Sequence, residues 1–475
     1  MNPNHLMSKP DLNIIVIVLD SLRQDHVGFY RSLYGWPRVF DNVPPPDTPN
    51  LDKLASEGIV FTNAYPSGLP TIPVREELLT GQFTLPYHPW SPMHPDSYTM
   101  PELLRGLGYF TGLVSDTYHL FKPGMNYTKG FDTWFFIRGQ EYDTYGIPPP
   151  VNRRVDDYVT KDYYSNYAGS RAYVELVAQF LANIDDWRDE GDWFAARVFR
   201  TAINWVKDAY RKYSRFMLWI DSFDPHEPWI PPSRFDKYTD PGYKGPKLIL
   251  PMGGDAAKWY TNEQVNYIRG LYAGEVAYVD YYFGEFYNAL RDLGLLEQSI
   301  VILLADHGHP LADHGKFLKG GDRLYSELLK VPFMVRLPNG RHIVTDAIVQ
   351  FPDVLPTILG LLNLPETYTY PLAGRSFADL LNGSSRGHRA YAIMGYHEAA
   401  DRCIRDGEWS LIYRPDGRHE LYNLVKDPRE RVNLASEMPD KVNEMMSKLA
   451  LWFMNRSRPV RQIQARYELG GTGKA

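Results

Sequence analysis

The sequence predicts an α/β fold: a large domain with a mostly parallel central sheet flanked by helices, then a small C-terminal α+β subdomain with an antiparallel sheet. Apolar runs that end in an acidic residue alternate with longer helical segments, which is typical of a parallel sheet. Near the C-terminus the pattern changes to short alternating runs with Asp-Gly turns, which indicates hairpins. With 475 residues, 44% of them hydrophobic, the chain can bury a large core.

Four apolar runs are predicted to be buried parallel strands, because each is rich in β-branched or aromatic residues and stops at an aspartate. They are NIIVIVLD (13–20), YFTGLVSD (109–116), FMLWID (216–221) and SIVILLAD (299–306). In such sheets the ligand crevice lies beyond the carboxyl ends of the strands. The closing residues are Asp20, Asp116, Asp221 and Asp306.

Helical patterns lie between these strands and close the large domain. They are TPNLDKLASEG (48–58), MPELLRGLG (100–108), YVELVAQFLANIDDW (173–187), VAYVDYYFGEFYNALRDLG (276–294) and FPDVLPTILGLLNLP (351–365). We expect the large domain to span residues 1–385, with an insertion at about 140–215. The small subdomain is expected at 386–455, with short strands and a helix near 438–454, followed by a tail at 456–475.

Overall composition indicates which kinds of binding partner and which cellular location to expect. The net charge of −6 and the lack of a Lys/Arg block argue against nucleic acid. The apolar run IIVIVL is far shorter than the roughly 20 residues of a membrane-spanning helix, so no membrane partner is expected. Cys403 is the single cysteine, which excludes an internal disulfide and favours a cytoplasmic location. The tail could reach another subunit, so a homo-oligomer is possible.

Asp20, Asp306 and His307 form a candidate metal site at the strand ends. In ADHGH (305–309), Gly308 lets the backbone turn away, so the two preceding side chains can face one point. Carboxylate and imidazole together suit zinc or manganese better than calcium or magnesium, although those remain possible. Taken alone, Asp20 is also explained as the cap of the turn that follows its strand.

Thr71 lies in SGLPTIPVREELLTGQ (67–82), where Pro73, Glu76 and Glu77 predict a helix that begins near residues 71–73. Thr71 is therefore either a helix N-cap or a nucleophile. Beside a divalent cation at a helix N-terminus, its hydroxyl would have a lowered pKa. Arg75, one turn further on, would point toward the same anion.

The stretch TIPVREELLTG (71–81) resembles the sulfatase signature C/S-x-P-x-R-x-x-L-x-T-G of the alkaline phosphatase superfamily. Agreement continues in order from about residue 12 to about 455, through TPNLDKLASEGIVFTNAYPSG (48–68), FDPHEPWIPP (223–232), ADHGH (305–309), HGKFLKGGDRLYSELLKVPFMVRLP (314–338) and WSLIYRPDGRHELYNLVKDPRERVNLA (409–435).

The resemblance implies roles for individual residues. Asp20, Asp306 and His307 would bind the metal, which Thr71 would bridge as the nucleophile. Arg75 would orient Thr71 and the bound anion. His226 and Lys319 would bind substrate oxygens and assist the leaving group. Their alternative explanations are a packed loop histidine and a solvated loop lysine.

Departures from the family pattern point away from a calcium-dependent formylglycine sulfatase. Thr71 replaces the Cys or Ser that maturation converts to formylglycine. Ser21 replaces a second aspartate after the first strand, and His307 replaces an asparagine. SDTYHLF (115–121) replaces the usual lysine-histidine pair, which leaves Asp116 and His119 as candidates for substrate binding.

The chemistry of threonine favours phosphorus as the reacting atom. A formylglycine hydrate releases sulfate by breaking its own C–O bond, and threonine lacks that route. A phospho-threonine can be hydrolysed by in-line attack of water on phosphorus. We therefore expect hydrolysis of phosphate diesters or phosphonate monoesters through a phospho-Thr71 intermediate. The alternatives are a sulfatase without formylglycine and an inactive anion-binding protein of the same fold.

One divalent metal ion is expected, with a small-molecule ester as the substrate. A second ion is possible, because several further acidic and histidine residues cluster in sequence around the same loops. These residues are Asp224, His226, His309, Asp313 and His314.

Overall fold

The computed structural model describes residues 12–164, 170–364 and 372–456, so nearly all of the expected tail lies outside the described residues. Its largest sheet has eight strands in the order β11-β2-β10-β8-β1-β6-β4-β5. In chain order they are β1 (Asn13–Leu19), β2 (Ile59–Tyr65), β4 (Phe110–Ser115), β5 (Thr133–Phe136), β6 (Phe216–Ser222), β8 (Ser299–Ala305), β10 (Phe333–Arg336) and β11 (Ile343–Gln350).

All four predicted strands are present, as β1, β4, β6 and β8, and they are neighbours at the centre of the sheet. β1 pairs in parallel with β6 and β8, and β4 pairs in parallel with β6. β10 runs antiparallel to β2 and β8. The sheet is therefore mixed but mostly parallel, which confirms the predicted fold class. The parallel pairing brings Asp20, Asp221 and Asp306 to the same edge of the sheet.

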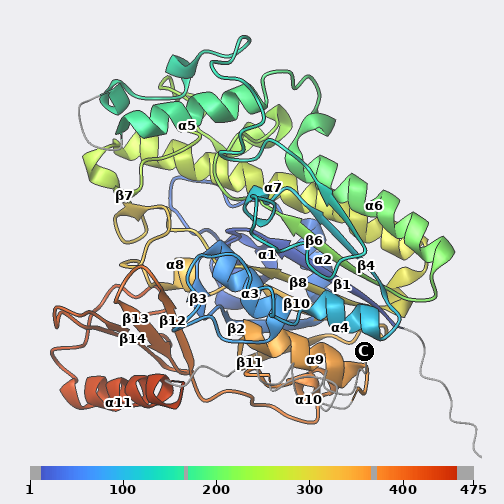
Figure 1. Ribbon diagram of the computed structural model, residues 1–475. Helices are drawn as coiled ribbons and strands as arrows, with labels where there is room; N and C mark the ends of the chain where they lie inside the picture. Colours follow the sequence, from blue (N-terminus) through green and yellow to red (C-terminus); the bar gives the residue numbers. More distant parts are fainter. Residues whose placement is uncertain (1–11, 165–169, 365–371, 457–475) are drawn as a thin grey trace, which may run out of the picture.

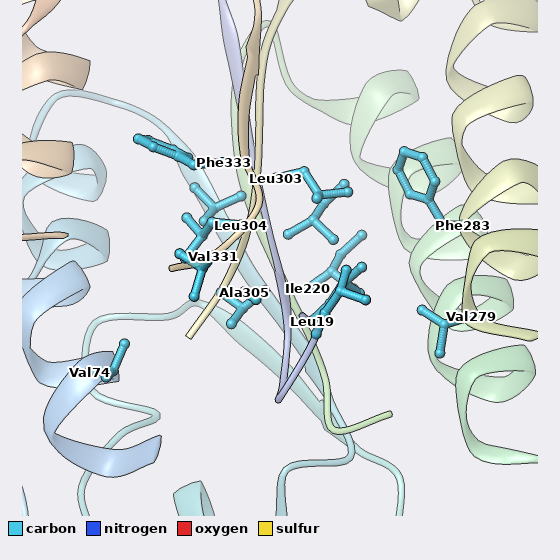
Figure 2. Close-up of a cluster of buried hydrophobic side chains, with 14 of the residues drawn as sticks. Leu19, Val74, Ile220, Val279, Phe283, Leu303, Leu304, Ala305, Val331 and Phe333 are labelled. Atoms are coloured by element: carbon cyan, nitrogen blue, oxygen red, sulfur yellow. The ribbon is translucent and has the colours of Figure 1, made fainter. Parts of the chain in front are cut away.

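Helices cover both faces of the sheet (Figure 1). They are α1 (Gly28–Tyr34), α2 (Pro49–Ser56), α3 (Thr71–Thr80), α4 (Met100–Gly106), α5 (Ser170–Asn183), α6 (Phe194–Lys212), α7 (Asn262–Asp292), α8 (Ser326–Leu329), α9 (Val354–Leu361), α10 (Ala378–Asn382) and α11 (Pro439–Asn455). Figure 2 shows Val279 and Phe283 of α7 packed on one side of the central strands and Val74 of α3 on the other. The core therefore holds α3 against the strand ends.

The small sheet lies at one end of the molecule with α11 beside it, at the lower left in Figure 1. Its order is β15-β14-β13-β12-β3, with β3 (Gly68–Leu69), β12 (Ala392–Tyr396), β13 (Arg402–Arg405), β14 (Trp409–Tyr413) and β15 (Glu420–Asn423). The outer strands are antiparallel, as predicted, but β12 pairs in parallel with β3. Because β3 directly precedes α3, the C-terminal sheet borders the segment that leads to Thr71.

The segment predicted as an insertion at about 140–215 contains α5 and α6 and lies between β5 and β6. α6 buries nine side chains, which extends the helical layer over the sheet. A further small pairing joins β7 (Gly254–Asp255) to β9 (Lys316–Phe317). Within the described ranges, no helix is both long and apolar enough to cross a lipid bilayer.

Candidate active site

Four side chains that lie far apart in sequence converge at the carboxyl ends of β1 and β8 and the start of α3. Asp20, Asp306 and His307 are fully buried and offer ligand atoms that all lie within 4.8 Å of one another. His307 Nε2 lies 3.4 Å from Asp306 Oδ2 and 4.0 Å from Asp20 Oδ1. The Thr71 hydroxyl lies 3.5 Å from the same Nε2 atom. The geometry predicted for these four residues is therefore present.

The local backbone fixes the orientation of this group. His307 Nδ1 lies 2.8 Å from the carbonyl oxygen of Gly308, so the Nδ1–H donates there and Nε2 keeps its lone pair for the site. Ser21 has a left-handed backbone (φ 62°), in which its N–H donates to Asp306 Oδ1 at 3.0 Å. The Ser21 hydroxyl donates to Asp20 Oδ1 at 2.9 Å. Ser21, one of the departures from the family pattern, thus ties the two carboxylates together.

Thr71 is the first residue of α3 rather than its N-cap. The cap position belongs to Pro70, and no side chain caps this helix end. Thr71 is 1% exposed, and the His307 contact at 3.5 Å is at the outer limit of a hydrogen bond. Capping therefore does not explain this threonine, and its hydroxyl is directed at the cluster of candidate ligands.

Arg75 lies one helical turn after Thr71, with its fully buried guanidinium among three carboxylates. Its Nε and Nη2 donate to Asp221 at 3.1 and 2.7 Å, Nη2 lies 3.0 Å from Asp20 Oδ2, and Nη1 donates to Asp306. Burial alone would raise the pKa of Asp306, but the positive charge of Arg75 holds that pKa well below its usual range. These contacts make Arg75 a counter-ion of the carboxylates. Its role in orienting Thr71 and the bound anion stays a prediction.

Glu77 fixes the segment that leads into α3, a role that the sequence did not reveal. Its carboxylate accepts backbone N–H groups from Ser67, Gly68 and Thr84 at 3.0, 2.9 and 3.1 Å. It also accepts the Thr84 hydroxyl at 3.0 Å. Since Glu77 lies on α3 itself, these bonds fasten the β3 turn to the helix that carries Thr71.

His226 and Lys319 face each other at the side of the cluster. His226 Nδ1 donates to the carbonyl oxygen of Glu227 at 2.6 Å, and its Nε2 contacts the Lys319 ammonium. Burial and the charge of Lys319 lower the pKa of His226 well below its usual value, so this imidazole is neutral. Lys319 is only partly buried, and its charge also acts on Asp20 and His307.

Asp116 and His119, the substitutes for the missing lysine-histidine pair, have other partners. Asp116 accepts the N–H of Phe223 at 2.7 Å and the amide of Gln140 at 3.3 Å, so both its oxygens are in use. His119 Nε2 lies 3.0 Å from Glu141 Oε2. These contacts give Asp116 a structural explanation. Substrate binding by either residue stays a prediction.

Of the five residues suggested for a second metal ion, His226 and His309 lie near each other, with their Nδ1 atoms 3.3 and 3.5 Å from Glu227 Oε2. The other three have separate partners. Asp313 pairs with Arg23 at 2.7 Å, His314 pairs with Glu327 at 2.7 Å, and Asp224 accepts the N–H of Ala195 at 3.1 Å.

A different group, Glu141, His226 and Glu227, has ligand atoms within 4.8 Å of one another. The Lys319 ammonium already contacts His226 Nε2 and supplies positive charge there. Sequence reasoning missed Glu141 and Glu227. The second directly follows His226 in DPHEP, while no sequence signal marks the first.

The residues at the primary cluster fit a divalent cation. Asp20 Oδ2 is buried with Arg75 Nη2 at 3.0 Å as its cationic neighbour, and His307 Nε2, whose ring donates through Nδ1, has only the Thr71 hydroxyl at 3.5 Å as a hydrogen-bond partner among the described residues. Burial and the charge of Asp306 raise the pKa of Asp20 well above its usual value, which marks excess negative charge. Two carboxylates and one imidazole form a ligand set that zinc or manganese accepts.

Known protein structures share the fold described above. The phosphonate monoester hydrolase of Agrobacterium radiobacter matches with a TM-score of 0.69 and 20% identity, covering 94% of this chain and 96% of that one. A structure solved with its substrate D-glucosamine-2-N,6-O-disulfate matches with a TM-score of 0.69 and 21% identity, covering 95% and 99%.

Curated sequences give the same family. Arylsulfatase K of Danio rerio is 23% identical over 441 residues, which cover 84% of this chain and 77% of the relative. The arylsulfatase of Clostridium perfringens is 25% identical over 466 residues, covering 89% and 90%. The family model for sulfatases matches residues 12–364, and that for the C-terminal part of N-sulphoglucosamine sulphohydrolase matches residues 312–455. This chain is a hydrolase that belongs to the sulfatase family.

Proposed function

We propose that this protein is a metal-dependent hydrolase of phosphate diesters or phosphonate monoesters that forms a covalent intermediate on Thr71. One observation carries the proposal: the Thr71 hydroxyl caps no helix and lies 3.5 Å from His307 Nε2, beside Asp20 and Asp306. The similarity in fold to a phosphonate monoester hydrolase, with a TM-score of 0.69, is consistent with it.

The balance of charge favours a singly charged substrate. The guanidinium of Arg75 faces Asp20, Asp221 and Asp306. The positive charges of this arginine and of one divalent cation would together neutralise the negative charges of the three carboxylates. His226 is neutral, which leaves the Lys319 ammonium for the substrate. The buried side chains of Glu141 and Glu227 lie nearby, and burial raises the pKa of Glu227 to about 7, so further negative charge is unfavourable there. A dianionic phosphate monoester would be repelled, whereas a diester or phosphonate monoester carries one negative charge.

In the proposed reaction, the Thr71 hydroxyl releases its proton to solvent water, and Oγ1 attacks phosphorus in line with the leaving group. The new Thr71 O–P bond forms as the P–O bond to the leaving alcohol breaks. Lys319 lies where its ammonium can bind a substrate oxygen and give a proton to the departing one, while His226 Nε2 holds that lysine in place. Water then attacks phosphorus from the side opposite Thr71 and gives a proton to the neutral Lys319 amine, while the P–O bond to Thr71 breaks and Oγ1 takes a proton from solvent.

A divalent cation held by Asp20, Asp306 and His307 would lower the pKa of the Thr71 hydroxyl and attract the substrate oxyanion. The protein itself supplies orientation. Glu77 fixes the turn before α3, and Ser21 locks the two carboxylates against each other. The reacting groups are therefore positioned before the substrate arrives.

Sulfate ester hydrolysis is the second candidate, because curated relatives are named arylsulfatases. A sulfate monoester is also singly charged, so the charge balance admits it. The obstacle is chemical: threonine offers no internal route for releasing sulfate, and water would have to attack sulfur in a sulfated enzyme.

Intermediate trapping tests the proposal. The protein, loaded with zinc, manganese, magnesium or calcium, is mixed with bis(p-nitrophenyl) phosphate or p-nitrophenyl sulfate and quenched with acid. The protein is then digested, and the mass of the peptide that contains Thr71 is measured by mass spectrometry. We expect turnover of the diester and a p-nitrophenyl phosphoryl group on Thr71, which differs in mass from a sulfate group.

Metal analysis and the Thr71→Val variant serve as controls. The variant should bind as much metal as the wild type and carry no adduct. Turnover of the sulfate alone would select the second candidate. Absence of turnover with every metal and both esters would contradict both candidates.

A further inference from the structure

Tyr396 is a buried tyrosine whose hydroxyl lacks a partner near the candidate site. It ends β12, and its backbone pairs with Leu69, two residues before Thr71. The residue is 7% exposed, and its hydroxyl oxygen makes no hydrogen bond with any described residue. Since most buried tyrosine hydroxyls are hydrogen-bonded, this one needs an explanation.

The surroundings of Tyr396 belong to the site. A Cβ atom placed on Gly321, in the loop that carries Lys319, would lie 3.6 Å from Tyr396 Cβ. Burial raises the pKa of Tyr396 well above its usual value. Arg323 opposes this rise, while Asp306 and Glu227 add to it. The ring therefore lies between the Thr71 segment and the Lys319 loop, within range of the site carboxylates.

A phenylalanine would fill the same space without burying an unpaired hydroxyl. An unpaired buried donor costs stability, so packing alone gives no reason for the oxygen. The cost disappears when a bound molecule supplies the acceptor. An ester bound beside Thr71 and Lys319 carries such acceptors, its non-bridging oxygens.

We propose that Tyr396 is a substrate-contacting residue, and that its hydroxyl donates a hydrogen bond to a non-bridging oxygen of the bound ester. This inference rests on the proposed chemistry at Thr71. It makes the C-terminal sheet one wall of the site, because β12 brings Tyr396 beside the strand that leads into α3. Orientation of the substrate then depends on both domains.

Phenylphosphonate binding to the manganese-loaded protein tests the inference, measured by calorimetry together with thermal unfolding. The pH is about 5.5, below the second pKa of the phosphonate, so that the ligand carries one negative charge like the proposed substrates. Tyr396→Phe should raise the dissociation constant for phenylphosphonate by about 3- to 10-fold, which is the effect of losing one neutral hydrogen bond. Its unfolding temperature should stay equal or rise, because the variant removes an unpaired buried hydroxyl. This combination separates a ligand contact from a structural role.

Tyr422→Phe is the matched control. Tyr422 lies in the same sheet and is 5% exposed, but its hydroxyl donates to Glu420 Oε2 at 2.7 Å. This variant should unfold at a lower temperature and bind phenylphosphonate as the wild type does.

Unchanged phenylphosphonate binding by Tyr396→Phe would overturn the inference, and so would weaker binding accompanied by a lower unfolding temperature. A wild type that binds no phenylphosphonate would overturn it as well. A wild type that binds phenylphosphonate but hydrolyses no ester would contradict the proposed function while the Tyr396 comparison remains valid.

Discussion

Replacement of Thr71 by valine separates catalysis from stability, because it exchanges one hydroxyl for a methyl group. The nearest polar partner of that hydroxyl is His307 Nε2, at 3.5 Å, so little hydrogen bonding is lost. We expect the free energy of unfolding to change by less than about 0.5 kcal/mol. The loss of the nucleophile should lower kcat/KM at least about 1,000-fold, equal to about 4 kcal/mol in the barrier.

Thr80→Val in the same helix gives the opposite expectation. Thr80 is also 1% exposed, but its hydroxyl donates to the carbonyl oxygen of Glu76 at 2.6 Å. Its replacement should cost about 1 kcal/mol of stability and leave kcat/KM unchanged. Both variants are compared by urea unfolding and by hydrolysis of bis(p-nitrophenyl) phosphate. A Thr71→Val enzyme within tenfold of the wild type would refute Thr71 as the nucleophile.

Three further variants test the supporting structure. Arg75→Met leaves three carboxylates buried without their guanidinium and should cost at least about 3 kcal/mol in urea unfolding, with partial recovery in manganese; wild-type stability would contradict this. Glu77→Gln places an amide against backbone N–H donors, so both the unfolding temperature and kcat should fall, and an unchanged kcat would remove its positioning role. Burial lowers the pKa of His314, but Glu327 outweighs it and raises that pKa to about 9. The stabilisation that the protonated His314 gains from Glu327 is complete below the ordinary histidine pKa of 6.5 and is lost as pH rises through 9. His314→Gln should therefore be less stable than the wild type at pH 6 and equally stable at pH 10. A stability difference that persists at pH 10 would count against the ion pair.

The sequence predicted the centre of the fold because the central strands are long, buried on both faces and continuously apolar. β2, β5, β10 and β11 were missed. β5 and β10 have four residues each and too little pattern, and polar residues interrupt the apolar pattern of β2 (IVFTNAY) and β11 (IVTDAIVQ). α7 was predicted only from residue 276, although it begins at Asn262. Its start carries a capping box from Thr261 to Gln264, which is a recognisable signal.

Convergence of the candidate ligands followed from the parallel sheet, because residues at the ends of neighbouring parallel strands must lie together. The residues suggested for a second metal ion were only partly brought together, because His226 and His309 both lie beside Glu227 but the others do not. Asp313 and His314 are close to His307 in sequence, but the loop carries them toward Arg23 and Glu327. Closeness in sequence places side chains together only where a strand or helix fixes their direction.

Arg75 shows why a motif alone does not define the contacts of a residue. An arginine one turn after Thr71 reaches the site whether it binds a substrate anion or neutralises protein carboxylates, so the motif fits both. In the structure three carboxylates surround its guanidinium. Asp221, at the end of β6, accepts from Nε and Nη2, Asp20 lies 3.0 Å from the same Nη2, and Asp306 accepts from Nη1. Because β6 pairs with β1 in the sheet, the order of the strands places Asp221 beside Asp20 and makes this arginine a counter-ion of protein carboxylates.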